Sequence, residues 1–66
     1  MDKETVRGFL QWLERATDEE IEARRQKFLN ARKQVSGRDA RADIALGLRL
    51  IDEELVARQG LWSTQT

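Results

Sequence analysis

The pattern of apolar and polar positions along the chain predicts helices and no strands. Apolar side chains recur every three or four residues, proline is absent, and good helix formers fill the space between the four glycines. The pattern places helices at about residues 3–15, 18–35 and 39–59, followed by a polar tail at 61–66 that is expected to fray. We therefore expect one small all-α domain over residues 1–66.

The first of these segments has a single apolar face. At about 100° per residue, the following apolar side chains share that face: Val6, Phe9, Leu10, Trp12, Leu13 and Ala16. Charged and amide side chains occupy the opposite face. The segment is typical of a helix that docks on a core, and Trp12 at the edge of the face is interpreted as core packing.

A helix start is indicated by Thr17-Asp18-Glu19-Glu20, which has the form of a capping box. The Thr17 hydroxyl would accept from the amide of Glu20, and the Glu20 carboxylate would reach back to Thr17. Acidic residues in this first turn also suit the positive end of the helix dipole. The alternative is one continuous helix from Lys3 to Val35, since no residue in between forbids it.

The second and third segments carry apolar lines that match each other. Ile21, Phe28 and Val35 are spaced by sevens, which favours long antiparallel or coiled-coil-like packing. The third segment has a stripe at 4-3-4 spacing: Ile44, Leu48, Ile51 and Leu55. These lines predict an antiparallel helical hairpin, with the first segment as a short N-terminal helix or extension.

Two glycines are expected to end helices. Gly37 would take a positive φ in the turn after the second helix. Gln59-Gly60-Leu61 would form a Schellman stop, with Leu61 folding back towards Val56.

A second apolar line, made of Leu46, Leu50 and Ala57, runs along the other side of the third segment. It must meet the first helix, a second copy of the chain or a foreign partner, and the adjacent Gly47 permits close approach. A chain of 66 residues without cysteine or histidine has no disulfide or imidazole-bound metal to stabilise it, so oligomerisation is the remaining route. We expect a homodimeric helical bundle that buries Leu46 and Leu50 or the first helix.

The missing residue types also limit chemistry. Without cysteine and histidine, the usual activated nucleophiles and a neutral-pH proton shuttle are absent, so the chain is not expected to be an enzyme or to hold a metal or cofactor. No apolar run is long enough to span a membrane, and the start MDKETVRGFL lacks the form of a signal peptide. A cytoplasmic location is expected.

Charge is balanced overall but unevenly placed. Residues 24–41 hold seven basic side chains against Asp39 alone, although the chain has twelve basic and twelve acidic residues. Such a region suits an acidic protein surface or a phosphate backbone. Nucleic acid is the less favoured partner, because the net charge is zero, the pI is about 6.2 and no DNA-binding motif is present.

The expected partner-binding residues are therefore basic side chains with apolar neighbours: Arg24, Arg25, Arg32, Arg38, Arg41, Leu46 and Leu50. Arginine supplies planar, multi-donor groups that suit such a surface. In the opposing interpretation, these arginines only solubilise the chain and cover the apolar seam with their stems. The apolar stripe or Trp62 is then the better candidate for the partner site.

The runs ATDEEIEARRQKFLNARKQVSGRD and RADIALGLRLIDEELVAR give the chain a family resemblance. Over about residues 16–60 they resemble small proteins of Mu-like phages and prophages, most of all the phage-encoded quorum-sensing anti-activator family. The resemblance implies a dimeric helical hairpin in the cytoplasm of a bacterial host. It also implies binding to the DNA-binding domain of a LuxR-type regulator, and to a type IV pilus assembly ATPase. The alternative is a small DNA-binding phage repressor or an architectural helical protein.

Overall fold

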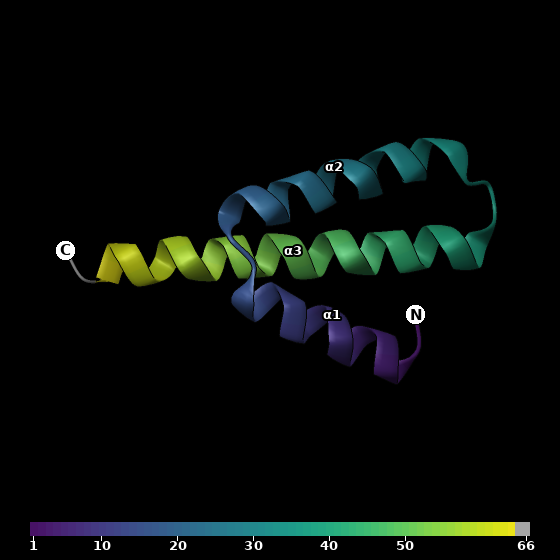
Figure 1. Ribbon diagram of the computed structural model, residues 1–66. Coiled ribbons are helices and arrows are strands. Elements are labelled where there is room, and N and C mark those ends of the chain that lie inside the picture. The colour runs from purple at the N-terminus through teal and green to yellow at the C-terminus, as the bar shows by residue number, and fades with distance from the viewer. Residues whose placement is uncertain (65–66) are drawn as a thin grey trace.

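The structure, a computed structural model, describes the backbone of residues 1–64 and the side chains of residues 1–60. Within that part of the chain, the regular structure consists of α1 (Lys3–Arg15), α2 (Asp18–Gln34) and α3 (Arg38–Thr64) (Figure 1). The expected all-α fold is confirmed. No helix among the described residues is both long and apolar enough to cross a membrane.

Side chains define the starts of α1 and α2. The Asp2 carboxylate accepts from the Thr5 amide across 2.7 Å. The capping box is confirmed, because Thr17 Oγ1 accepts from the Glu20 amide at 3.1 Å and Glu20 Oε1 accepts from the Thr17 amide at 3.0 Å. Ala16 and Thr17 both have extended backbone, with ψ of 147° and 161°, so the alternative of one continuous helix is wrong.

The turn between α2 and α3 does not use a left-handed glycine. No glycine among the described residues has a positive φ, so the conformation predicted for Gly37 is wrong. Val35 breaks α2 instead with extended backbone, at φ −90° and ψ 143°. The Gly37 carbonyl then accepts from the Arg41 amide at 3.0 Å, which starts α3.

The stop predicted at Gly60 is also wrong, because α3 continues through it to Thr64. Glycine permits a left-handed end without requiring one, and inside an exposed helix it costs only about 1 kcal/mol relative to alanine. The predicted contact of Leu61 with Val56 lies outside the described side chains, as does Trp62. Of the tail expected to fray, residues 61–64 belong to α3 and residues 65 and 66 lie outside the described part.

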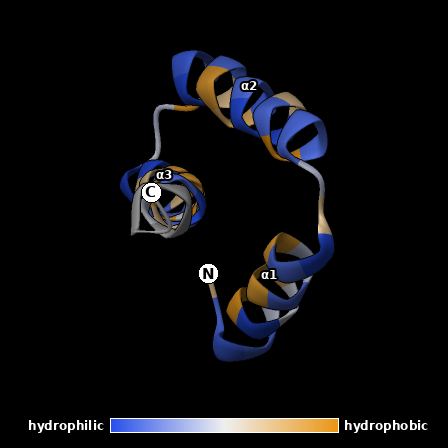
Figure 2. Ribbon diagram, turned by 90° about the vertical axis from the view of Figure 1, so that its left-hand side faces the viewer, coloured by the Kyte–Doolittle hydropathy of each residue, from blue (hydrophilic) through white to orange (hydrophobic). Residues whose placement is uncertain are grey.

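α3 lies against both other helices. It packs most extensively on α2, which runs in the opposite direction, whereas α1 runs alongside α3 in the same direction (Figure 1). Seen along α3, α2 and α1 both lie on the same side of it, α2 above and α1 below (Figure 2). The core forms where the three helices meet, from Leu13, Ala16, Ile21 and Ile51.

Gly47 allows α2 to approach α3 closely. A Cβ atom at this position would lie 3.0 Å from Cε2 of Phe28, so the aromatic ring rests directly on the glycine. The Phe9 ring of α1 meets Phe28 edge-on, with centroids 5.8 Å apart. The close approach expected at Gly47 is thus made with α2, and Phe28 connects all three helices.

Arg58 of α3 joins the end of α1 to the start of α2. Its Nη2 atom donates to the carbonyls of Leu13 at 2.7 Å and Ala16 at 2.9 Å. Its Nε atom donates to Glu54 and its Nη1 atom to Asp18, and these hydrogen bonds, chiefly the one to Glu54, raise the pKa of the guanidinium above its ordinary value.

Candidate protein-interaction surfaces

Two of the expected partner-binding arginines have partners within the chain. Arg24 of α2 stacks over the Trp12 ring of α1, with its Cζ atom 4.8 Å from the ring centroid. Arg25 places Nε 3.4 Å from an Asp52 oxygen of α3, as an ion pair without hydrogen-bond geometry, and it also approaches Glu22. Arg24 therefore links α2 to α1, and Arg25 links α2 to α3.

The other three, Arg32, Arg38 and Arg41, are exposed at the end of the molecule where α2 turns into α3. We call them the turn-end arginines. Residues 1–60 supply no ion pair to any of them. Lys33 adds a further cation in the last turn of α2, and Asp39 is the acid nearest in sequence.

The helix dipoles stabilise some of these cations and destabilise others. Arg32, in the last turn of α2, lies at a negative helix end, which stabilises it. Arg38 and Arg41 lie in the first turns of α3, at a positive helix end that disfavours cations. The dipole of α3 therefore does not stabilise Arg38 or Arg41.

Leu46 and Leu50 lie further along α3 than Arg38 and Arg41. At about 100° per residue, Leu46 lies about 140° around the helix from Arg41 and about 80° from Arg38. Both leucines are half-buried, and Leu50 packs against the core that includes Leu13 of α1. Part of the second apolar line is thus covered by helices of the same chain.

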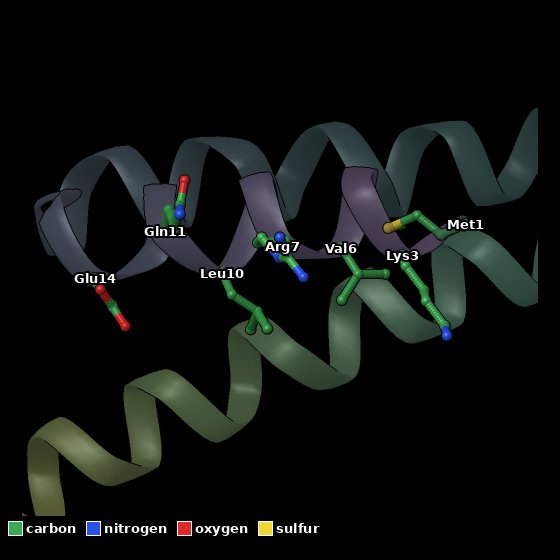
Figure 3. A pocket seen from close by; sticks show the side chains of 7 residues that line it. All are labelled: Met1, Lys3, Val6, Arg7, Leu10, Gln11 and Glu14. Carbon is green, nitrogen blue, oxygen red and sulfur yellow. The ribbon is translucent and has the colours of Figure 1, made fainter.

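A groove along α1 was not anticipated from the sequence. Figure 3 shows it, with Val6 and Leu10 on the same edge of α1 as Lys3, Arg7 and Glu14. The groove is open, has a volume of about 500 Å³ and is bordered by Lys3, Arg7 and Glu14. Leu10 remains 42% exposed within it. The signal that could have revealed it is the 4-3-4 spacing of residues 3, 7, 10 and 14.

A second shallow hollow lies on the outer face of α3. It is formed around Val56, which is 65% exposed, and is bordered by Arg49, Asp52 and Glu53. Its charges are already paired within the chain, because Arg49 Nε lies 3.2 Å from Glu53 and Asp52 contacts Arg25.

The described residues contain no cluster of histidine, cysteine or acidic side chains that would hold a metal ion. The surface features of these residues are the turn-end arginines, the α1 groove and the hollow around Val56. Comparison of the chain with protein-family models, with curated proteins and with solved structures gave no match.

Proposed function

We propose that this chain is a protein–protein interaction inhibitor that works as a homodimeric helical hairpin with an added N-terminal helix. It binds a regulatory protein of a bacterial host and covers that protein's functional surface. The observation that supports this most is the group of turn-end arginines, which are exposed, lie in the last turn of α2 or the first turn of α3, and have no ion-pair partner in residues 1–60. They lie at the tip of the molecule, where α2 connects to α3. A protruding tip of this kind can bind in a groove on another protein.

The chemistry of these side chains favours a protein partner with exposed carboxylates or carbonyl groups. A guanidinium presents several donors in one plane and binds carboxylates in a bidentate manner. Arginine is also enriched among the residues that dominate interface energetics. The proposed partner surface therefore presents several hydrogen-bond acceptors to the tip.

The resemblance to phage anti-activators supplies the identity of the proposed target. It is the DNA-binding domain of a LuxR-type quorum-sensing activator, with a type IV pilus assembly ATPase as a further target. In this proposal the protein acts by stoichiometric occupation in the cytoplasm of the host. The chain needs no catalytic group or cofactor for that role.

A small DNA-binding repressor is the second candidate, because Arg32, Lys33, Arg38 and Arg41 are exposed cations close in sequence to the turn between α2 and α3. Zero net charge disfavours it, since non-specific affinity for DNA depends on counterion release by basic residues. A repressor that neutralises several phosphates would lose DNA affinity steeply between about 50 and 200 mM salt. The inhibitor would show no useful affinity for duplex DNA.

Charge reversal at the tip tests the proposal. The test variant combines Arg32→Glu and Arg38→Glu, and the matched control combines Lys27→Glu and Arg49→Glu, two exposed cations away from the tip. Purified LuxR-type DNA-binding domain is titrated with each protein at fixed salt. We expect the test variant to lose more than tenfold in affinity, about 1.4 kcal/mol, while the control stays within about threefold, or 0.6 kcal/mol.

Each other outcome has a defined meaning. If the unmodified protein does not bind the domain, the assigned target is wrong. If the test and control variants bind equally, the tip is not the binding surface. If the protein binds duplex DNA with steep salt dependence, the repressor replaces the inhibitor as the proposed function.

A further inference from the structure

We infer that the α1 groove is the contact between two copies of the chain, filled by α1 of the second copy running antiparallel to the first. The inference rests on the homodimer of the proposed function and names its interface. It concerns α1, away from the turn-end arginines, so the two surfaces can be tested separately.

The residues along the groove have an order that matters. Lys3, Arg7, Leu10 and Glu14 follow each other at 4-3-4 spacing, so they lie on one line of α1. Cations lie at one end of this line, an exposed leucine near its middle and an acid at the other end. Residues 1–60 provide no ion pair for Lys3, Arg7 or Glu14.

The charges along this line match those of a second, antiparallel copy of α1. Along a helix that rises 1.5 Å per residue, Arg7 lies about 4.5 Å before Leu10 and Glu14 about 6 Å after it. A twofold axis at Leu10 would place each Arg7 within about 1.5 Å, along the helix direction, of Glu14 from the other copy. The pair of opposite charges therefore forms twice, on either side of a contact between the two Leu10 side chains.

A parallel arrangement has the opposite result. It would set Arg7 against Arg7 and Glu14 against Glu14 of the second copy, and like charges in contact oppose association. The charge pattern thus selects the antiparallel orientation. Val6, half-buried beside Leu10, extends the apolar part of the contact.

The hollow on the outer face of α3 has no comparable set of unpaired charges. Arg49 and Glu53 already neutralise each other across 3.2 Å within one helix. Val56 is more exposed than Leu10, at 65% against 42%, but no unpaired charges of opposite sign border it. It therefore serves as the reference surface in the test.

Charge exchange tests the ion pairs. Arg7→Glu and Glu14→Arg are made singly and together, and the dimer dissociation constant is measured by sedimentation equilibrium. Each single variant should raise that constant at least tenfold, because like charges then face each other twice. The double variant should return it to within about threefold of the unmodified protein, and circular dichroism should show equal helicity throughout.

Disulfide trapping tests the position of the axis. The chain contains no cysteine, so each introduced cysteine is unique. Leu10→Cys should form a covalent dimer under oxidised glutathione, whereas Val56→Cys should remain uncrosslinked at the same concentration. Arg7→Cys mixed with Glu14→Cys should give a crosslinked heterodimer in excess over either homodimer.

The outcomes separate this interface from the proposed function. A protein that is monomeric at all concentrations removes both the homodimer and this interface. A dimer that is unaffected by the single charge variants, or that crosslinks through Val56→Cys and not through Leu10→Cys, overturns the interface and leaves the homodimer intact. The Arg32→Glu and Arg38→Glu variant should dimerise like the unmodified protein, and weakened dimerisation there would place the interface at the tip.

Discussion

The guanidinium of Arg58 donates to the backbone carbonyl of Ala16 across 2.9 Å. The same nitrogen serves the Leu13 carbonyl at 2.7 Å. The last carbonyl groups of a helix have no N–H donor within the helix. The negative end of the helix dipole also favours a cation at this place. A side chain of α3 thus completes the end of α1, and through Asp18 it also holds the start of α2.

Removing this side chain should loosen the attachment of α1. We expect Arg58→Ala to lower the melting temperature clearly more than Arg49→Ala, because Arg49 makes one exposed ion pair within its own helix. Arg58→Lys should fall between wild type and Arg58→Ala, since an ammonium keeps the charge but cannot reproduce the fork of donors. Thermal melts followed by circular dichroism measure all three. Equal melting temperatures for Arg58→Ala and Arg49→Ala would contradict the structural role of Arg58.

The core should be sensitive at Ile51, whose side chain is fully buried where the helices meet. Ile51→Ala leaves a cavity and should cost about 2–5 kcal/mol of unfolding free energy. That is a large share of the stability of so small a domain. Val56→Ala, on the exposed face of α3, should change it by less than about 0.5 kcal/mol. Urea denaturation gives both values, and similar losses in the two variants would argue against this core.

Two glycine substitutions should differ because of their surroundings. Gly8→Ala, with nothing within 4 Å of the added methyl group, should stabilise the protein by about 0.5–1 kcal/mol through helix propensity. Gly47→Ala gains the same propensity but pushes the Phe28 ring, which lies 3.0 Å from the new Cβ. We expect it to be less stable than Gly8→Ala by about 1 kcal/mol or more, from the strain of overpacking. Equal stability in urea would mean that Phe28 does not rest on Gly47.

Stability should fall in acid partly through the capping box. The backbone hydrogen bond from Thr17, followed by its side-chain hydrogen bond, lowers the pKa of Glu20 below its ordinary value of 4.5. A lowered folded pKa means that this stabilisation is complete above pH 4.5 and is lost as the pH falls through the folded pKa. The hydrogen bonds with Thr5 likewise lower the pKa of Asp2, from 3.8.

The variant Glu20→Gln isolates the Glu20 contribution. Glutamine can still reach back in a capping box but does not titrate. We expect its melting temperature to decline less than that of the unmodified protein as the pH is lowered from 5 to about 3, the range set by the ordinary pKa of a carboxyl group. Parallel declines in the two proteins would show that Glu20 has the same pKa in the folded and unfolded states.

Local features were the easier part to predict from the sequence. The capping box joins Thr17 and Glu20, which are three positions apart. Its hydrogen bonds depend only on local backbone, so the sequence pattern is enough to predict them. The predictions of a positive φ at Gly37 and of a helix stop at Gly60 were wrong, because glycine permits a positive φ but does not require it. The break after α2 came from Val35, which has no turn signature.

Side-chain pairing depended on tertiary packing and could not be predicted. Arg25 finds Asp52 only because α2 and α3 pack in one particular register, and Arg24 finds Trp12 only because α1 folds back beside α2. Four of the five arginines expected to bind a partner are exposed without an ion pair in residues 1–60, and one of these four, Arg24, stacks on Trp12 instead. The sequence predicted an apolar face that includes Val6 and Leu10, but the groove that this face forms with Lys3, Arg7 and Glu14 depends on how much of α1 the other helices leave uncovered.

The extended backbone at Ala16 and Thr17 has a topological consequence. If both residues took helical ψ values, residues 3–34 would become one rod, about 48 Å long at 1.5 Å per residue. Leu13 and Ala16 would then leave the core, and the α1 contacts with Arg58 would be lost. Two backbone torsions thus separate a three-helix body from an open two-rod shape, and the capping box and Arg58 together select the compact topology.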